Sequence, residues 1–169
     1  ELIRSFHYVT LDASDKKNFG VLDPIVFLQG FEAKETAQDM IEQIYDLHGK
    51  DDVKTEILKS LDDVIEQRAK GETVGLMNVV DRLIENENNT ISSAGELLKQ
   101  MIHNSLLQLI FSYGDADTIN LNSKVTILEI AGLDLPNEDD DPRYYSDSDR
   151  KSLSIMIGLA KFCEKFGRR

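Results

Sequence analysis

Chemistry on phosphates would need two patterns of residues. The first is Gly-x4-Gly-Lys-Ser/Thr, in which backbone amides and a lysine surround the phosphate oxygens, and the 169 residues contain no such run. The second is an apolar strand that ends in an aspartate for magnesium, and its nearest candidate is residues 76–81 (LMNVVD). The apolar residues of this run recur with a period near 3.6, and Asn78 interrupts them. We therefore predict that residues 76–81 form part of a helix.

The histidines His7, His48 and His103 are scattered along the chain. His103 precedes Asn104 and Ser105, a combination that could suggest nucleophilic catalysis. Such catalysis needs a base within hydrogen-bond reach of the nucleophile and a further group that orients the base. Adjacent residues of a helix do not face each other, and the sequence places no orienting acid. A surface or interface histidine is the favoured interpretation.

Two acidic stretches, residues 115–117 (DAD) and 137–141 (NEDDD), could suggest calcium binding. A calcium loop of the EF-hand type needs glycine at position six and glutamate at position twelve. Counted from Asp115, these positions hold Asn120 and Thr126, so the pattern fails. Solvated acidic loops are the favoured interpretation.

Two small basic or aromatic spots remain, at residues 143–145 (RYY) and 167–169 (GRR). Either could face a phosphate in a neighbouring subunit, but an ordinary surface is the favoured interpretation because short charged spots are mostly solvated. We therefore predict no catalytic, cofactor-binding or metal-binding residue in this chain.

The elements that carry these residues are indicated by the spacing of apolar residues. Residues 5–11 (SFHYVTL) and 124–130 (KVTILEI) are rich in β-branched and aromatic residues, which predicts two strands. A period near 3.6 predicts helices over residues 33–47, 52–70, 74–86, from Thr90 or Ser92 to 112, and from Ser146 or Asp147 to 166.

Two further segments have less regular patterns. Residues 21–28 (VLDPIVFL) are apolar, but Pro24 removes a ladder donor, which predicts an edge or extended segment. Residues 136–145 form an acidic, proline-containing loop that we expect to be mobile. Two strands alone make a poor core, so we expect chain outside these residues to complete the sheet. Because exposed strand edges recruit other strands, the two strands should pair with each other or with a second copy.

Composition limits the classes of function. The chain carries 31 acidic and 19 basic residues, a net charge of −12, which would repel a phosphate backbone and argues against direct nucleic-acid binding. A lone cysteine, Cys163, excludes an internal disulfide and favours a reducing compartment. No run of about 18 apolar residues occurs, as a membrane-spanning helix would require. The first and last residues read as cuts inside a longer protein.

Several stretches, taken in order, resemble conjugative-transfer (type IV secretion) ATPases. Residues 18–24 (NFGVLDP) are similar to a segment that follows the phosphate-binding half of those proteins. Residues 109–114 (LIFSYG) and 125–136 (VTILEIAGLDLP) resemble a later run, and residues 152–167 resemble the helix ahead of the magnesium strand. The resemblance spans residues 6–169 and is strongest to TraE/TraC-like versions on Gram-positive conjugative elements.

The resemblance implies a RecA-like motor of the FtsK/HerA group. Such motors are hexameric, work at the cytoplasmic face of the membrane, and power pilus assembly or substrate transfer. The implied partners are other subunits of the hexamer and other secretion-channel proteins. ATP and Mg²⁺ are implied for the full-length protein alone, because the phosphate-binding loop would lie before Glu1 and the magnesium strand after Arg169. No catalytic residue is therefore carried over.

The expected fold class is α+β and mostly helical: a fragment of a RecA-like α/β ATPase domain with an inserted helical subdomain and two strands. We expect residues 1–32 to be a strand and an extended segment of the ATPase core. Residues 33–114 would form the helical insertion, and residues 115–169 the returning strand, acidic loop and helix.

The expected function is that of a non-catalytic inner segment of the motor, inactive alone, which makes contacts with other subunits or partners. The alternative is a free-standing helical protein-binding or regulatory domain. A metal-dependent hydrolase has only its acidic composition in its favour.

Overall fold

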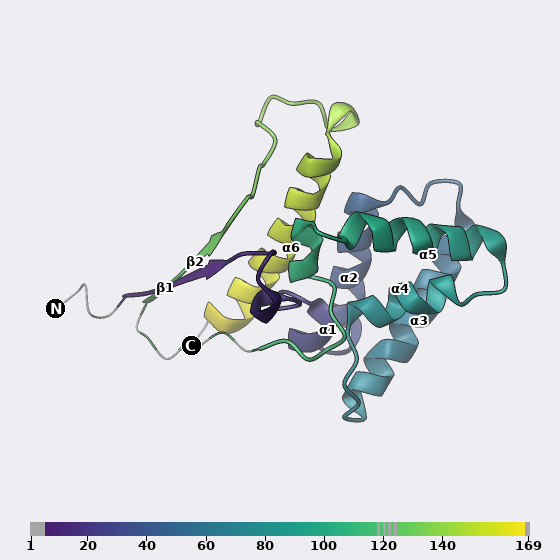
Figure 1. Ribbon diagram of the computed structural model, residues 1–169, viewed down its shortest axis with the longest axis horizontal. Helices are drawn as coiled ribbons and strands as arrows, with labels where there is room; N and C mark the ends of the chain where they lie inside the picture. The colour runs from purple at the N-terminus through teal and green to yellow at the C-terminus, as the bar shows by residue number, and fades with distance from the viewer. Residues whose placement is uncertain (1–5, 118, 120, 122, 124, 168–169) are drawn as a thin grey trace.

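The computed structural model describes residues 6–117, 119, 121, 123 and 125–167 (Figure 1). Within these residues the elements follow one another in this order: β1 (Phe6–Leu11), the short 3-10 helix η2 (Lys16–Asn18), α1 (Pro24–Phe27), α2 (Gly30–Ile44), α3 (Asp51–Ala69), α4 (Leu76–Ile84), α5 (Asn89–Ile102), the 3-10 helix η3 (Leu106–Leu109), β2 (Val125–Ile130), the 3-10 helix η4 (Pro142–Tyr144) and α6 (Asp147–Gly167). The protein is thus mixed α and β and mostly helical, as predicted.

The two strands pair with each other in parallel. Phe6 lies opposite Val125, and Leu11 lies opposite Ile130. Both predicted strands and their pairing are confirmed, although the expected first residues, Ser5 and Lys124, lie outside the described part of the chain. Parallel strands need a long crossover connection, and here the helices α1 to α5 lie within it.

Successive side chains of a strand point to opposite faces of the sheet. On one face, Leu11 is buried and Val9 packs against the core. Leu128 of β2 shares a hollow with Phe162 and Phe166 of α6, so α6 covers this face. The sheet therefore has one face directed at the protein interior.

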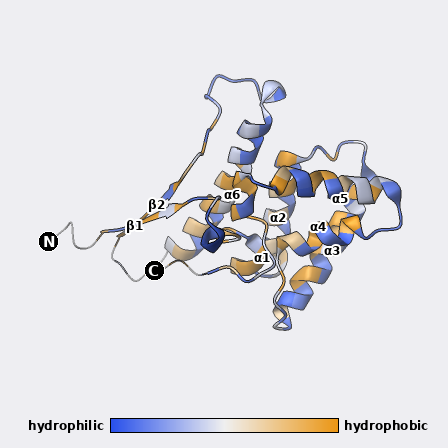
Figure 2. Cartoon of the chain, in the orientation of Figure 1, coloured by the Kyte–Doolittle hydropathy of each residue, from blue (hydrophilic) through white to orange (hydrophobic). Residues whose placement is uncertain are grey.

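The helices form two groups beside the strands (Figure 1). α2 packs along α6, while α3, α4 and α5 pack against one another, with α2 also contacting α3. Apolar residues gather where these helices meet (Figure 2). α2 and α6 approach closely: the Ser154 hydroxyl donates to the Met40 carbonyl at 2.9 Å. Among the described residues, no helix is both long enough and apolar enough to cross a membrane.

Four predicted helices correspond to α2, α3, α4 and α6, with small shifts of their bounds. Residues 76–81 lie in α4, so the interpretation of this run as helical rather than as a magnesium-holding strand is confirmed. Gly71 follows α3 with φ +91°, which is the left-handed conformation that glycine adopts after a helix.

The fourth predicted helix was expected to continue to residue 112, and this was wrong. α5 ends at Ile102, because His103 leaves the helix at φ −58° and ψ 127° and Asn104 has φ +51°. Ser105 then starts η3, and its side chain accepts a hydrogen bond from the Leu107 amide at 3.2 Å. Serine side chains compete for backbone groups in this way and favour helix starts over helix interiors.

The extended segment predicted for residues 21–28 was also wrong, because residues 24–27 form the short helix α1. Pro24 occupies the first turn, where a missing amide hydrogen costs nothing. Asp23 caps this helix by accepting from the Ile25 amide at 2.8 Å. Between residues 136 and 145, η4 forms after the cap Asp141, and the mobility of this loop stays a prediction.

Candidate functional site

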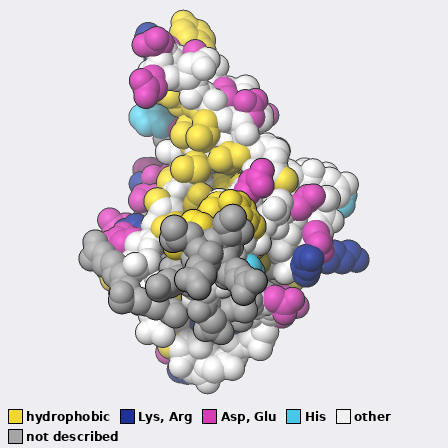
Figure 3. All heavy atoms as spheres, turned by 90° about the vertical axis from the view of Figure 1, so that its left-hand side faces the viewer, with side chains coloured by type: hydrophobic (Ala, Val, Ile, Leu, Met, Phe, Trp, Pro, Cys, Tyr) yellow, Lys and Arg dark blue, Asp and Glu magenta, His cyan; other side chains and the backbone are white. Residues whose placement is uncertain are grey.

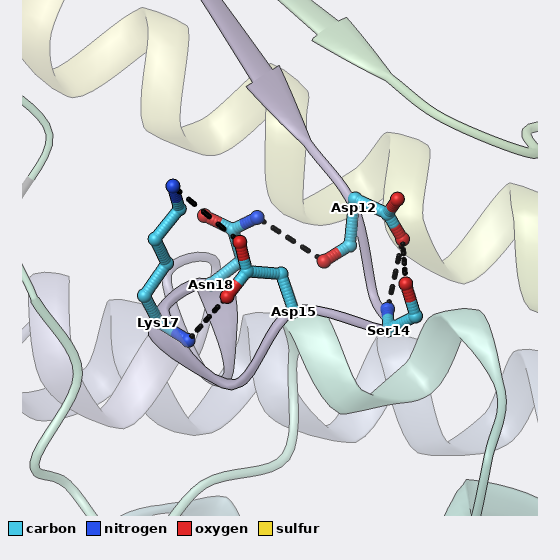
Figure 4. Close-up of polar contacts among 5 residues, drawn as sticks. All are labelled: Asp12, Ser14, Asp15, Lys17 and Asn18. Atoms are coloured by element: carbon cyan, nitrogen blue, oxygen red, sulfur yellow. Dashed lines mark hydrogen bonds and ion pairs between the residues drawn. The ribbon is translucent and has the colours of Figure 1, made fainter.

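The loop that follows β1 is fixed by its own side chains (Figure 4). The Asp12 carboxylate accepts from the Ser14 amide at 2.9 Å and from the Ser14 hydroxyl at 2.6 Å, and these bonds lower the pKa of Asp12. Asn18 is buried, and its side-chain amide donates to the Asp12 carbonyl at 3.1 Å. The loop therefore has a defined shape at the carboxyl end of β1.

Asp15 and Lys17 complete this network (Figure 4). Asp15 caps η2 by accepting from the Lys17 amide at 3.1 Å, and the ammonium of Lys17 lies 3.4 Å from the same carboxylate. This ion pair is exposed and contributes little to stability. Its effect is to place Lys17 and its neighbour Lys16 at the surface of the loop.

The next residues lie against a segment far along the chain. The Gly20 amide donates to the Gln108 carbonyl at 2.9 Å, and the Leu22 amide donates to the Leu109 carbonyl at 2.9 Å. Gly20 has φ +73°, and a side chain there would collide with Ser112. Residues 18–24 and 109–114, two of the stretches on which the family resemblance rests, are therefore in contact.

Asp23 lies at the centre of this contact and is fully buried. One carboxylate oxygen caps α1, as described above. The other accepts from the Leu76 amide at 2.9 Å and from the Ser112 hydroxyl at 2.6 Å. One carboxylate thus joins three segments: the start of α1, the start of α4 and the chain after η3. In the sequence, Asp23 is part of the stretch at residues 18–24 that carries the family resemblance, but nothing there indicates a role for it as a link between these segments.

The surroundings of Asp23 are tightly packed and mostly uncharged. Burial raises the pKa of Asp23 to about 7, against the opposing effect of the hydrogen bonds from Ser112, Leu76 and Ile25. Arg68 reaches the edge of this region from α3, and its guanidinium donates to the Gly114 carbonyl at 2.8 Å and the Val74 carbonyl at 3.4 Å.

Two adjoining hollows lie beside the loop that follows β1, one of them at the carboxyl ends of both strands, and we call them together the strand-end groove. Their volumes are about 430 Å³ and 630 Å³, and they share Lys16, Phe19, His103 and Gln108. Asp12, after β1, and Ala131, after β2, line the second hollow. The remaining residues of the groove are Ala13, Ser14, Lys17, Met77, Lys99, Ile102, Asn104, Ser105, Leu106, Phe111, Ser112, Tyr113, Asp115, Ala116 and Asp117.

The place and the composition of the groove make it the candidate functional site. In α/β proteins, ligands bind in the crevice outside the carboxyl ends of parallel strands. The groove combines lysine, aspartate and aromatic side chains, which suit contacts with a polar or mixed surface. The Gln108 side chain donates to the Ala13 carbonyl at 2.9 Å and so joins the β1 loop to η3 inside the groove.

The candidate residues from the sequence are not brought together. His103 lines the groove and lies 3.1 Å from the Asn104 side-chain amide. Ser105 instead donates its hydroxyl to the Met101 carbonyl at 2.7 Å, so the geometry of a nucleophile and its base is not formed. His7 lies in β1 and His48 follows α2. The three histidines thus occupy separate places.

The other basic and acidic spots are also separate. Arg143 of η4 forms an exposed 2.6 Å ion pair with Asp141, the residue that caps η4. Arg168 and Arg169 lie outside the described residues. Asp140 accepts from the Asn137 amide at 2.8 Å, so part of this acidic loop closes a turn. In the ranges that the structure describes, no three His, Cys, Asp or Glu residues are grouped so as to hold a metal ion.

A nucleotide with Mg²⁺, which the family resemblance implies for the full-length protein, does not fit these residues. The 169-residue sequence lacks the glycine- and lysine-containing loop that surrounds phosphates. The Asp23 carboxylate is fully buried and already accepts three hydrogen bonds, so it is not open to a hydrated cation. No step of ATP chemistry is therefore assigned to this chain.

Comparison with known proteins gives two findings. The family model of the AAA-like domain matches residues 1–169. Uncharacterized protein YddE of Bacillus subtilis (strain 168) is 36% identical over 165 residues, which cover 98% of this chain and 20% of that protein. The chain thus spans about a fifth of the length of this relative. No solved structure matches the chain.

Proposed function

The chain belongs to the AAA-like domain family, and we propose that it is a non-catalytic inner segment of a conjugation or type IV secretion motor ATPase. In this proposal the segment contacts other motor subunits or other proteins of the secretion channel. ATP and Mg²⁺ bind to parts of the full-length protein other than this chain. The full-length protein is a hexamer that works at the cytoplasmic face of the membrane and powers DNA or protein transfer.

The observation that carries the proposal is the uncovered outer face of the parallel sheet. Parallel sheets are normally covered on both faces. Here α6 covers one face, while on the other Phe6 is 40%, Tyr8 70% and Val125 41% exposed. Figure 3 shows hydrophobic side chains gathered on the side of the molecule that carries the strands. A larger sheet with further covering elements accounts for these exposed residues.

Two other observations support the proposal. The similar B. subtilis protein is about five times as long as this chain, since the match covers 20% of it. The stretches that resemble conjugative-transfer ATPases, residues 18–24 and 109–114, meet at Asp23, so they form one structural unit. The strand-end groove offers the exposed side chains through which the segment would make its contacts.

The experiment compares ATP turnover by the whole protein that the gene encodes with turnover by the 169-residue chain. We expect the whole protein to hydrolyse ATP and the chain alone to show neither turnover nor tight nucleotide binding. Turnover by the purified chain, or a whole protein without the phosphate-binding loop, would overturn the proposal. The second result would favour a free-standing binding or regulatory domain.

A pair of variants of the whole protein tests the contact role. Lys99 lines the groove, whereas Lys59 is an exposed lysine on α3 that is not among the residues lining it. We expect Lys99→Glu to reduce assembly, measured by sedimentation, and ATP turnover by several-fold, because it reverses a charge at the contact. Lys59→Glu should leave both unchanged. If the two variants show the same assembly and the same ATP turnover, the groove is not a contact surface of the motor.

A further inference from the structure

The helical region, residues 30–109, begins and ends at the same place. Residues 20 and 22 bind the backbone of residues 108 and 109, and Asp23 binds Ser112 across 89 residues of chain. The start of α4, in the middle of the helical region, reaches the same carboxylate across 53 residues. Asp23 therefore holds together the points at which the helical region leaves and rejoins the strands.

Ser112 also belongs to the groove. Its side chain lines the first hollow together with Tyr113 and residues 115–117. The Ser112 hydroxyl accepts from the Gly114 amide at 3.1 Å, and the Ser112 carbonyl accepts from the Met77 amide at 2.9 Å. Residues 112, 113 and 115–117 thus form a wall of the groove, and Asp23 is one of the groups that hold this wall in place.

We propose that Asp23 and Ser112 form a proton-controlled latch, which holds this wall closed when Asp23 carries a proton and releases it more readily when Asp23 is ionised. A protonated Asp23 can donate to the Ser112 oxygen, because the hydroxyl of Ser112 can rotate and reverse its role. The remaining lone pairs of the carboxyl group still accept from the Leu76 and Ile25 amides. Protonation therefore preserves the three partners of the carboxyl group and removes a buried charge.

Ionisation of Asp23 disfavours the closed position of the groove wall. A buried charge is costly unless it is paired, and the three hydrogen bonds compensate only in part, since the pKa of Asp23 is raised to about 7 in the closed state. Opening exposes the carboxyl group to water and returns its pKa toward the ordinary value of 3.8. The closed state thus binds a proton that the open state releases. Opening therefore becomes easier as pH rises from about 4 to about 7 and levels off above that range.

Charged groups surround the latch on the neighbouring elements. Arg68 of α3 binds the Gly114 and Val74 carbonyls. Burial, and then the hydrogen bond to Asp81 of α4, raises the pKa of Tyr113. Lys99 of α5 and Asp115 line the groove beside Ser112.

The test is hydrogen exchange of single backbone amides of the 169-residue chain, measured by NMR between pH 4 and pH 8 and corrected for intrinsic rates. The opening constants of the Leu76 and Gly114 amides should rise by up to about tenfold per pH unit below pH 7 and then become constant. They should exceed the opening constant of Leu98, a buried residue inside α5, at every pH. A larger value at the latch separates local release from global unfolding.

Variants give the second measurement. In Asp23→Asn, the pH dependence at Leu76 and Gly114 should disappear, because the amide does not titrate. Ser112→Ala should increase opening at all pH values and retain the pH dependence. The latch is refuted if the wild-type opening constants do not change with pH, or if Leu76, Gly114 and Leu98 share one opening constant, which would mean that Asp23 ionises only when the whole chain unfolds.

Discussion

At the scale of single residues, the contact around Asp23 depends on glycines that leave no room for a side chain. A Cβ atom on Gly75 would collide with the Ser112 carbonyl and would lie 2.6 Å from the Asp23 carboxylate and 2.7 Å from the Gly114 amide. Two of these neighbours are backbone atoms, which cannot rotate away. Gly75 itself has φ −146°, an ordinary extended conformation, so only this lack of space excludes other residues.

We predict that Gly75→Ala lowers the free energy of unfolding by about 3 kcal/mol, the upper part of the range for overpacked sites. Urea denaturation of the 169-residue chain measures the change. Gly49→Ala is the matched control: Gly49 has φ +73° and nothing near its missing side chain, so only the backbone cost of about 1 kcal/mol applies. Equal losses in the two variants would show that the junction is loosely packed.

The sequence could identify these residues only in part. An aspartate before a proline is a signal for a helix start, and residues 22–25 contain that signal, yet the proline was interpreted as an interruption of an extended segment. The convergence of Leu76 and Ser112 on Asp23 had no signal at all, since hydrogen bonds between distant segments follow no periodic pattern. A buried carboxylate of this kind becomes apparent only when the segments are folded together.

At the scale of the elements, α6 is attached at its carboxyl end by an aromatic cluster. The Phe162 ring packs edge-on against Phe27 of α1 with ring centres 5.4 Å apart, and its centre lies 4.7 Å from that of Phe166. Phe162 is 6% exposed. This cluster joins α1, which follows Asp23, to the helix that covers the sheet.

We predict that Phe162→Ala lowers the free energy of unfolding by about 3 to 5 kcal/mol, because it leaves a cavity between α1 and α6. Thermal or urea unfolding followed by circular dichroism gives the value. Phe31→Ala provides the control with the same change of side chain, since Phe31 is 79% exposed at the start of α2, and it should alter stability by less than about 0.5 kcal/mol. A small effect at Phe162 would mean that α6 is held mainly by its contacts with α2.

Apolar spacing predicted the long elements well and the irregular ones poorly. α2, α3, α4 and α6 each bury one stripe of apolar residues, which is the feature that a period of about 3.6 detects. η3 carries the same kind of residues as α5, so spacing alone merged the two. The break lies at Asn104 and Ser105, and the cap at Ser105 is the local signal that could have revealed it.

At the scale of the whole molecule, two opposing terms govern association between copies. The outer face of the sheet exposes Phe6, Tyr8 and Val125, and exposed apolar strands favour contacts with other chains. The net charge of −12 opposes such contacts by repulsion. Salt screens the charge but not the apolar surface, so the balance between the two terms can be shifted without any mutation.

We predict that the 169-residue chain self-associates weakly through this face, and that its weight-average mass in sedimentation equilibrium rises with protein concentration and with salt. Tyr8→Lys should weaken the association several-fold, because it places a charge on the outer face without touching the core. Tyr144→Lys is the matched control, since Tyr144 is 82% exposed on η4 rather than on the sheet, and it should associate as the wild type does. A mass that stays monomeric at all salt concentrations, or equal effects of the two variants, would show that the exposed strands do not drive association. In the whole protein, where we propose that further chain covers this face, Tyr8→Lys should instead lower the free energy of unfolding.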